Sequence, residues 1–155
     1  MLKPSRYIQS NEKFFQKSQP ERFSTAEVLI FNEKLALELG VHDWEYLDEI
    51  LSGQYQNMQP IALAYAGHQF GHFVPQLGDG RAHLLGEIDA PNGKNYDLQL
   101  KGSGRTPFSR GGDGFSPLAP ALRELLISEA MSHLSIPTTR SLGVVKTGET
   151  VFRET

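Results

Sequence analysis

The sequence of 155 residues contains no cysteine. This absence excludes a disulfide framework, a thiol nucleophile and a thiolate zinc site within these residues, and it fits a reducing compartment. Long hydrophobic runs are also missing, because a run such as residues 61–66 is far shorter than the ~20 residues that span a bilayer. Behind the basic flank of residues 1–7 no apolar segment follows, so no secretory signal is predicted. We therefore expect a cytoplasmic protein with no membrane partner.

An excess of positive charge is lacking too. The 15 Lys and Arg residues stand against 18 Asp and Glu residues, which gives a formal net charge of −3. No nucleic-acid partner is expected from this balance. With 39% hydrophobic and 21% charged residues, the composition is typical of a globular chain.

Two regions differ in character on either side of Pro60. Residues 1–59 are predicted to form an N-terminal arm and helical extension. Within them, residues 1–22 are polar and broken by proline, which predicts an extended arm. Two helices are expected to follow, one from about Thr25 to Gly40 and a short one over 43–51.

Residues 60–155 show a mixed pattern of strands and one long helix. The predicted order is a strand that is interrupted by residues 67–72, a hairpin, a glycine-rich loop, a helix and a final hairpin. The pattern indicates an α+β fold with an antiparallel sheet. The corresponding ranges are 61–66 for the first strand, 81–89 and 95–101 for the hairpin, 102–116 for the loop, 117–134 for the helix, and 141–146 with 149–153 for the last hairpin.

The turn formed by Gly78, Asp79, Gly80 and Arg81 directly precedes a predicted strand. Glycines let a backbone approach a ligand closely and point N–H groups at an anion, and arginine offers bidentate contacts to phosphate. A plain turn with a surface arginine would give the same sequence.

Lys101 ends the second strand of the predicted hairpin, and Glu124 follows on the predicted helix. Kinases hold phosphates with a strand lysine that a helix glutamate orients. This pattern predicts a Lys101–Glu124 ion pair at a nucleotide site. The alternatives are a solvated strand face for Lys101 and an ordinary exposed position for Glu124.

The stretch 101–114 is rich in glycine and arginine. Such a segment can enclose a polyphosphate with main-chain N–H groups and guanidinium groups, although a flexible solvent loop is the alternative. His68 and His72 have the i, i+4 spacing of a zinc-binding helix, but Gly71 disfavours a helix there and the general-base glutamate is missing. A ring donor to backbone or phosphate is the preferred interpretation of these histidines.

These residues resemble the selenoprotein O family. The resemblance covers nearly the whole chain and is dense after Pro60, in long and unusual motifs. The motifs are AYAGHQFG (64–71), QLGDGRA (76–82), LQLKGSG (98–104), TPFSRGGDG (106–114), Arg123-Glu124 and IPTTR (136–140).

The resemblance implies the small lobe of a protein-kinase-like fold that transfers AMP from ATP to Ser, Thr or Tyr hydroxyls of proteins. ATP sits reversed in that family relative to ordinary kinases, and Mg²⁺ or Mn²⁺ is the implied metal. By position, the implied ATP contacts are Gly78, Gly80, Arg81, Lys101, Asp113 and Gly114. Glu124 matches the glutamate that supports the lysine.

Length is the departure from the family, whose members have several hundred residues. The catalytic base and the metal ligands are expected downstream of Thr155, so we expect no catalytic residue and no metal ligand within this chain. A C-terminal lobe is the implied partner, and the chain alone is expected to be an incomplete lobe without activity. Two other functions stay open, a γ-phosphoryl-transferring enzyme and a non-catalytic nucleotide-binding or interaction module.

Overall fold

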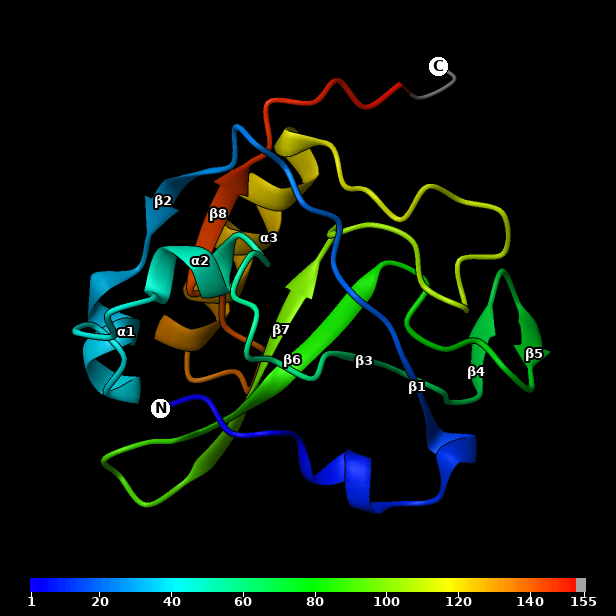
Figure 1. The fold of residues 1–155 in the computed structure, drawn as a ribbon, viewed down its shortest axis with the longest axis horizontal. Coiled ribbons are helices and arrows are strands. Elements are labelled where there is room, and N and C mark those ends of the chain that lie inside the picture. Colours follow the sequence, from blue (N-terminus) through cyan, green and yellow to red (C-terminus); the bar gives the residue numbers. More distant parts are fainter. Residues whose placement is uncertain (153–155) are drawn as a thin grey trace.

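An antiparallel sheet of four strands forms the centre of the computed structural model, which describes residues 1–152 (Figure 1). Its longest part is a hairpin that was predicted from strand alternation and the Asn92-Gly93 turn, and the structure confirms it. In spatial order, the strands are β1 (Phe15–Lys17), β3 (Ile61–Leu63), β6 (Ala82–Asp89) and β7 (Asn95–Lys101).

Two further antiparallel pairs lie outside this sheet. One pair joins β2 (Glu27–Phe31) to β8 (Gly143–Lys146), and the other is the small hairpin of β4 (Gly67–Gln69) and β5 (His72–Val74). The predicted interruption at 67–72 is therefore itself a hairpin. With its few helices, the chain has an α+β fold with antiparallel sheets, as the sequence indicated.

The helix predicted to begin near Thr25 begins later. Residues 27–31 form β2 because they pair with β8, which satisfies their backbone groups between strands. Helix α1 (Glu33–Leu39) starts only after Asn32, whose side chain accepts a hydrogen bond from the Leu35 N–H at 3.0 Å. Its predicted end is confirmed, since Gly40 caps it with a φ of 69°.

The predicted C-terminal hairpin is wrong in its second strand. Strand β8 lies within the predicted range 141–146, but its partner is β2 and residues 149–152 form no strand. The β2–β8 contact continues just beyond the two strands, where Thr25 Oγ1 donates to the Thr147 carbonyl at 2.7 Å. Arg153, the last residue of the predicted strand, lies outside the described residues.

Helix α2 (Leu47–Leu51) falls inside its predicted range, and α3 (Leu118–His133) matches the predicted helix to within one residue at each end. The N-terminal arm contains two 3-10 turns, Arg6–Gln9 and Glu12–Phe14, before β1 joins it to the central sheet. Both sides of residue 59 thus contribute strands to one sheet. Within residues 1–152 no helix is long and apolar enough to cross a bilayer.

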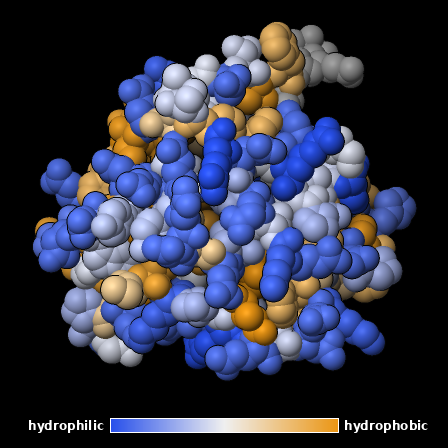
Figure 2. Space-filling model, in the orientation of Figure 1, coloured by the Kyte–Doolittle hydropathy of each residue, from blue (hydrophilic) through white to orange (hydrophobic). Residues whose placement is uncertain are grey.

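The hydrophobic core lies mainly between the helices α1 and α2 and one face of the β6–β7 hairpin (Figure 1). A smaller cluster of Phe15, Ile61 and Leu84 joins β1, β3 and β6. Figure 2 shows a largely hydrophilic face on which apolar patches are scattered. Helix α3 contributes no buried residue, and Leu126 and Ile127 are 65% and 60% exposed. The long helix therefore packs on β8 with its apolar side chains still largely open to solvent.

Candidate functional site

Lys101 and Glu124 meet where strand β7 ends beside helix α3. The ammonium group of Lys101 lies 2.8 and 2.9 Å from the two carboxylate oxygens of Glu124, so the bond is bidentate. Both side chains are about half exposed, at 48% and 49%. An exposed pair of this kind contributes about 0–1 kcal/mol to stability. The pair therefore adds little to the stability of the fold, and it places the ammonium group of Lys101 beside α3.

The turn of residues 78–81 lies next to the end of β7. The Gly102 N–H donates to the Arg81 carbonyl at 2.7 Å, and Lys101 pairs with Ala82 in the sheet. Arg81 is exposed. These contacts bring Arg81 and Lys101, both predicted to hold phosphates, to the same edge of the sheet.

The amides of the two turn glycines are used inside the protein. The Gly78 N–H donates to the Tyr65 carbonyl and the Gly80 N–H to the Gly78 carbonyl, both at 3.1 Å. In this conformation the turn offers an anion the side chain of Arg81, whereas the amides of Gly78 and Gly80 are engaged. The glycines have a second role, because a Cβ at Gly78 would lie 2.5 Å from the ring of Phe108.

The two ends of the glycine-rich loop 102–116 are bonded to each other, and we call this closed part the neck of the loop. Ser103 and Phe115 form an isolated antiparallel bridge, and the Gly104 N–H donates to the Gly114 carbonyl at 3.2 Å. One carboxylate oxygen of Asp113 accepts a hydrogen bond from the Phe115 N–H at 3.0 Å. Asp113 and Gly114 are thereby placed at the returning end of the loop, opposite the residues that follow Lys101.

The loop and the 78–81 turn are in direct contact. Thr106 and Ser109, in the first half of the loop, donate from their hydroxyls to the carbonyls of Asp79 and Gly80. The Asp79 side chain is itself buried. The structure therefore brings Gly78, Gly80, Arg81, Lys101 and the loop into one assembly, with Glu124 reaching it from α3.

Tyr65 reaches the Asp79 carboxylate with its hydroxyl, at 2.8 Å. Burial raises the pKa of Tyr65 to about 12, and the hydrogen bond to Asp79 acts in the same direction. The phenol therefore stays protonated near neutral pH and acts as a donor.

His83 lies beneath the start of the loop with no exposed surface. Its Nδ1 is 2.7 Å from Ser103 Oγ, and its Nε2 is 3.0 Å from Ser18 Oγ. Burial lowers the pKa of His83, so the ring is neutral near neutral pH. A neutral ring joins the N-terminal arm to the neck of the loop.

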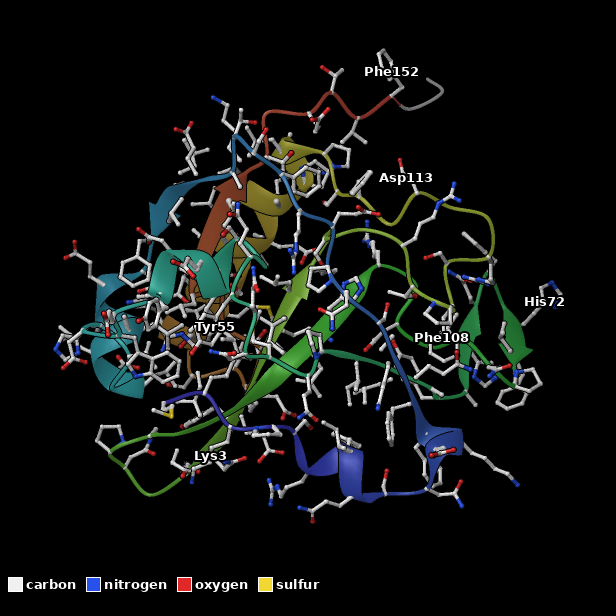
Figure 3. The ribbon with its side chains drawn as sticks, viewed as in Figure 1. Lys3, Tyr55, His72, Phe108, Asp113 and Phe152 are labelled. Atoms are coloured by element: carbon white, nitrogen blue, oxygen red, sulfur yellow. The ribbon has the colours of Figure 1, made fainter. Side chains whose placement is uncertain are left out.

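The two histidines considered for zinc lie on the β4–β5 hairpin and not on a helix. His68 is opposite Phe73 and His72 is opposite Gln69, so the two histidines face opposite sides of the hairpin. His68 packs its ring edge-on against Phe73 with centroids 5.5 Å apart, and His72 points outward (Figure 3). Within residues 1–152 no group of three His, Cys, Asp or Glu side chains lies close enough to hold a metal ion.

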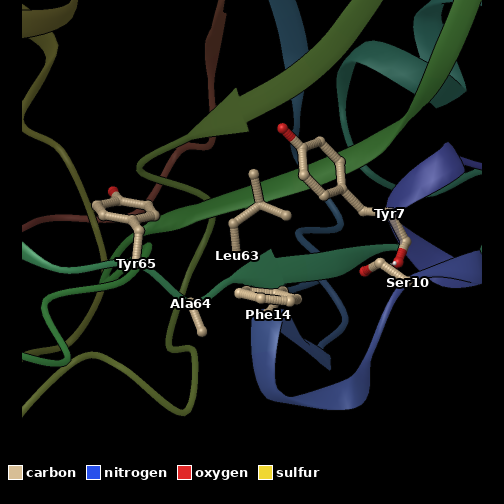
Figure 4. Close-up of a pocket in the computed structure, with 6 residues that line it drawn as sticks. All are labelled: Tyr7, Ser10, Phe14, Leu63, Ala64 and Tyr65. Atoms are coloured by element: carbon tan, nitrogen blue, oxygen red, sulfur yellow. Dashed lines mark hydrogen bonds between the residues drawn. The ribbon is translucent and has the colours of Figure 1, made fainter.

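A small cavity of about 190 Å³ opens beside strand β3 (Figure 4). Its lining is mainly aromatic and apolar, and it contains none of the residues predicted to contact ATP. Leu63 and Tyr65 connect it to the 78–81 turn, because both donate hydrogen bonds to the Asp79 carboxylate. The lining residues are Tyr7, Ser10, Phe14, Leu63, Ala64 and Tyr65.

Sequence reasoning missed several residues that hold this site together, namely Asp79, His83, Thr106 and Ser109. Asp79 was named as part of the predicted turn, but nothing in the local sequence indicated that its carboxylate accepts hydrogen bonds from Leu63, Tyr65 and Gln99. For the two hydroxyls in the loop and the buried histidine, no local pattern distinguishes a structural hydrogen bond from solvent exposure.

The known proteins that resemble this chain point to a single family. A model of the protein adenylyltransferase SelO family matches residues 3–155. The chain is 50% identical over 154 residues to the protein nucleotidyltransferase YdiU of Teredinibacter turnerae, which covers 95% of the chain and 32% of that protein. It is 55% identical over 156 residues to the YdiU protein of Rhodopseudomonas palustris, covering 96% and 32%. For the YdiU protein of Clostridium botulinum (strain Alaska E43) the identity is 53% over 155 residues, covering 96% and 31%.

The chain therefore spans about a third of the length of the curated relatives it matches. The family match extends over almost every residue, including the 78–81 turn, the glycine-rich loop and both members of the ion pair. It confirms the resemblance that the motifs indicated. The chain belongs to the protein adenylyltransferase SelO family.

Proposed function

We propose that this chain is the ATP-binding part of a protein adenylyltransferase, built as the small lobe of a kinase-like fold. One observation carries the proposal: Lys101 is held by both carboxylate oxygens of Glu124 at the edge of the glycine-rich loop. Kinase-type sites hold their phosphate lysine in the same way, with a glutamate from the helix that follows.

The proposed contacts to ATP are divided between side chains and backbone. Lys101 and Arg81 hold phosphate oxygens as cations, and the loop residues Asp113 and Gly114 contact the nucleotide from the opposite side of the neck. Gly78 and Gly80 shape the turn that presents Arg81. Positioning and charge stabilisation of this kind account for most of the catalysis in phosphoryl-type transfers.

In the proposed reaction, the hydroxyl oxygen of a Ser, Thr or Tyr side chain of a protein substrate attacks the α-phosphorus of ATP. A new P–O bond forms, the bond to the β-phosphate bridging oxygen breaks, and pyrophosphate leaves. The hydroxyl proton passes to a base that is not among the residues assigned here. Mg²⁺ or Mn²⁺ is the implied metal, but the described residues do not cluster as a metal site, so no step is assigned to it.

The test compares ATP labelled at the α-phosphate with ATP labelled at the γ-phosphate, using the complete protein and a protein acceptor. Transfer of the α-label alone is expected. Lys101→Ala should abolish the transfer, because the cation that holds the phosphates is removed. Lys146→Ala is the matched control: this lysine also ends a strand in an exposed ion pair, 3.2 Å from Glu27, but on β8. Wild-type activity in Lys101→Ala would refute the site.

The same experiment separates the other two functions. Transfer of the γ-label would identify a phosphoryl transferase, which needs the same hold on the phosphates. Binding of ATP without transfer of either label would identify a non-catalytic nucleotide-binding module. If Lys101→Ala loses ATP binding and Lys146→Ala does not, the nucleotide would still be placed at this site.

A further inference from the structure

We propose that Asp79, Thr106 and Ser109 are positioning residues, which lock the 78–81 turn to the glycine-rich loop so that ATP meets a preformed site. We call these three residues the hydroxyl clasp, because the hydroxyls of Thr106 and Ser109 bond to the turn that contains Asp79. The inference rests on the proposed function, because it assigns these residues to the ATP site. None of them is required to touch ATP.

The two hydroxyls of the clasp bond the loop to the turn. Thr106 Oγ1 donates to the Asp79 carbonyl and Ser109 Oγ to the Gly80 carbonyl, each at 2.6 Å. Thr106 is only 9% exposed. Since a buried carbonyl without a donor costs about 1–3 kcal/mol, the bond from Thr106 is expensive to lose.

The same hydroxyls also accept hydrogen bonds within the loop. The Thr106 N–H donates to Ser109 Oγ at 2.8 Å, and the Phe108 N–H donates to Thr106 Oγ1 at 3.1 Å. Each hydroxyl therefore both donates and accepts, so its direction is determined. The bonds within the segment 106–109 therefore aim both hydroxyls at the carbonyls of the turn.

The Asp79 carboxylate secures the other side of the turn. It accepts hydrogen bonds from the Tyr65 hydroxyl at 2.8 Å, from the Leu63 N–H at 3.2 Å and from the Gln99 side chain at 3.4 Å. Leu63 lies on β3 and Gln99 on β7. The turn is thus bonded to two strands of the sheet by the side chain of Asp79 and to the loop by its carbonyl.

Close packing around Phe108 completes the clasp. A Cβ at Gly78 would lie 2.5 Å from the Phe108 ring, and one at Gly80 would lie 3.0 Å from the Phe108 carbonyl. Glycine at both positions permits this contact. Arg81 ends the clasped turn, and Asp113 and Gly114 belong to the loop that Thr106 and Ser109 hold against it, so the position of the loop relative to Arg81 depends on the clasp.

The prediction is that loss of a clasp hydroxyl impairs the reaction of ATP more than it unfolds the protein. A misplacement of 1 Å in a site can cost on the order of 100-fold in rate. We expect Thr106→Val and Ser109→Ala to lower kcat/KM for ATP by roughly 10- to 100-fold in the complete protein. Thr106→Ser keeps the hydroxyl and should restore activity to within about twofold of wild type.

Control variants remove hydroxyl-to-carbonyl hydrogen bonds of similar length at exposed positions away from the site. Thr25→Val removes a threonine bond of 2.7 Å to the Thr147 carbonyl, and Ser10→Ala removes a serine bond of 2.6 Å to the Tyr7 carbonyl. Both controls should stay within about twofold of wild-type kcat/KM. Thermal denaturation of every variant gives the change in stability separately.

The assay measures AMP transfer together with the affinity for ATP by calorimetry. The clasp is overturned if Thr106→Val and Ser109→Ala retain kcat/KM and ATP affinity within about twofold of wild type. It is also overturned if Thr106→Ser is as impaired as Thr106→Val, because the hydroxyl would then not be the cause. If the wild-type protein neither binds ATP nor transfers AMP, the proposed function fails and the clasp with it. A working wild type with unaffected clasp variants refutes the clasp alone.

Discussion

Replacement of the buried His83 tests how the neck of the glycine-rich loop is held. His83 is fully buried and contacts the hydroxyls of Ser18 and Ser103 at 3.0 and 2.7 Å. His83→Leu removes both contacts. A buried polar group without its partner costs about 1–3 kcal/mol, and because water reaches both serines in part, we expect a total of about 1–3 kcal/mol.

The pH dependence of the stability that His83 contributes is a more specific test than the loss of its two hydrogen bonds. Burial lowers the folded-state pKa of His83 below 6.5, against the opposing effects of an Arg105 backbone hydrogen bond and the Asp79 charge. A lowered histidine pKa means that the folded state favours the neutral ring. The stability from His83 is therefore fully present above about pH 6.5 and is lost as the pH falls through the folded-state pKa.

Hydrogen exchange measured by mass spectrometry suits this question, since it reports local opening within the complete protein. Peptides from residues 15–25 and 100–116 cover both sides of the histidine. After correction for intrinsic exchange, their protection in wild type should fall between about pH 7.5 and about pH 5.5. His83→Gln can still donate and accept a hydrogen bond but does not titrate, so its protection should fall less.

Equal pH slopes in wild type and His83→Gln would refute the reasoning. The charge state of the ring would then not affect the folded state in this range. Unchanged protection in His83→Leu would refute the hydrogen-bond argument separately.

Three other changes have predictable results in denaturation or sedimentation experiments. Gly78→Ala should destabilise the turn by about 1–3 kcal/mol, because its φ is 60° and the new Cβ would meet Phe108. Glu129→Gln should cost roughly 1–2 kcal/mol, since Arg140 donates to both carboxylate oxygens at 2.8 and 2.7 Å. The 155-residue chain alone should self-associate through the exposed apolar face of α3, where Ile127 is 60% exposed.

A specific result would contradict each of these three predictions. Wild-type stability in Gly78→Ala would mean that the Phe108 ring moves aside freely. Arg140 holds the pKa of Glu129 below its usual value, so wild type should lose more stability than the variant on acidification through that lowered pKa. Equal acid sensitivity would contradict this pairing. A sedimentation profile of a monomer at all concentrations would contradict self-association.

Local patterns predicted the elements whose contacts are close in sequence. The β6–β7 hairpin follows from alternation on either side of the Asn92-Gly93 turn, and α1 ends at Gly40 as predicted. The Lys101–Glu124 pair, whose members are 23 residues apart, was predicted instead from the kinase arrangement of a strand lysine and a glutamate on the following helix.

Contacts between distant segments could not be predicted in the same way. Residues 27–31 have apolar positions that suit either a helix or a strand, and only their pairing with β8 decides between the two. The bonds from Thr106 and Ser109 to the 78–81 turn likewise depend on how the loop folds back on the sheet. Tertiary contacts, rather than local propensity, determine these parts.

The pairing of β2 with β8 has a consequence for synthesis on the ribosome. Lys146, which bonds to Glu27, is translated 119 residues after it. At roughly 5–20 residues per second, β2 waits about 6–24 s for its partner to be made. During that interval Val28, Leu29 and Ile30 form an unpaired apolar strand edge, which nascent-chain chaperones can bind. We therefore expect β2 and β8 to pair late in folding, after the central β6–β7 hairpin has formed.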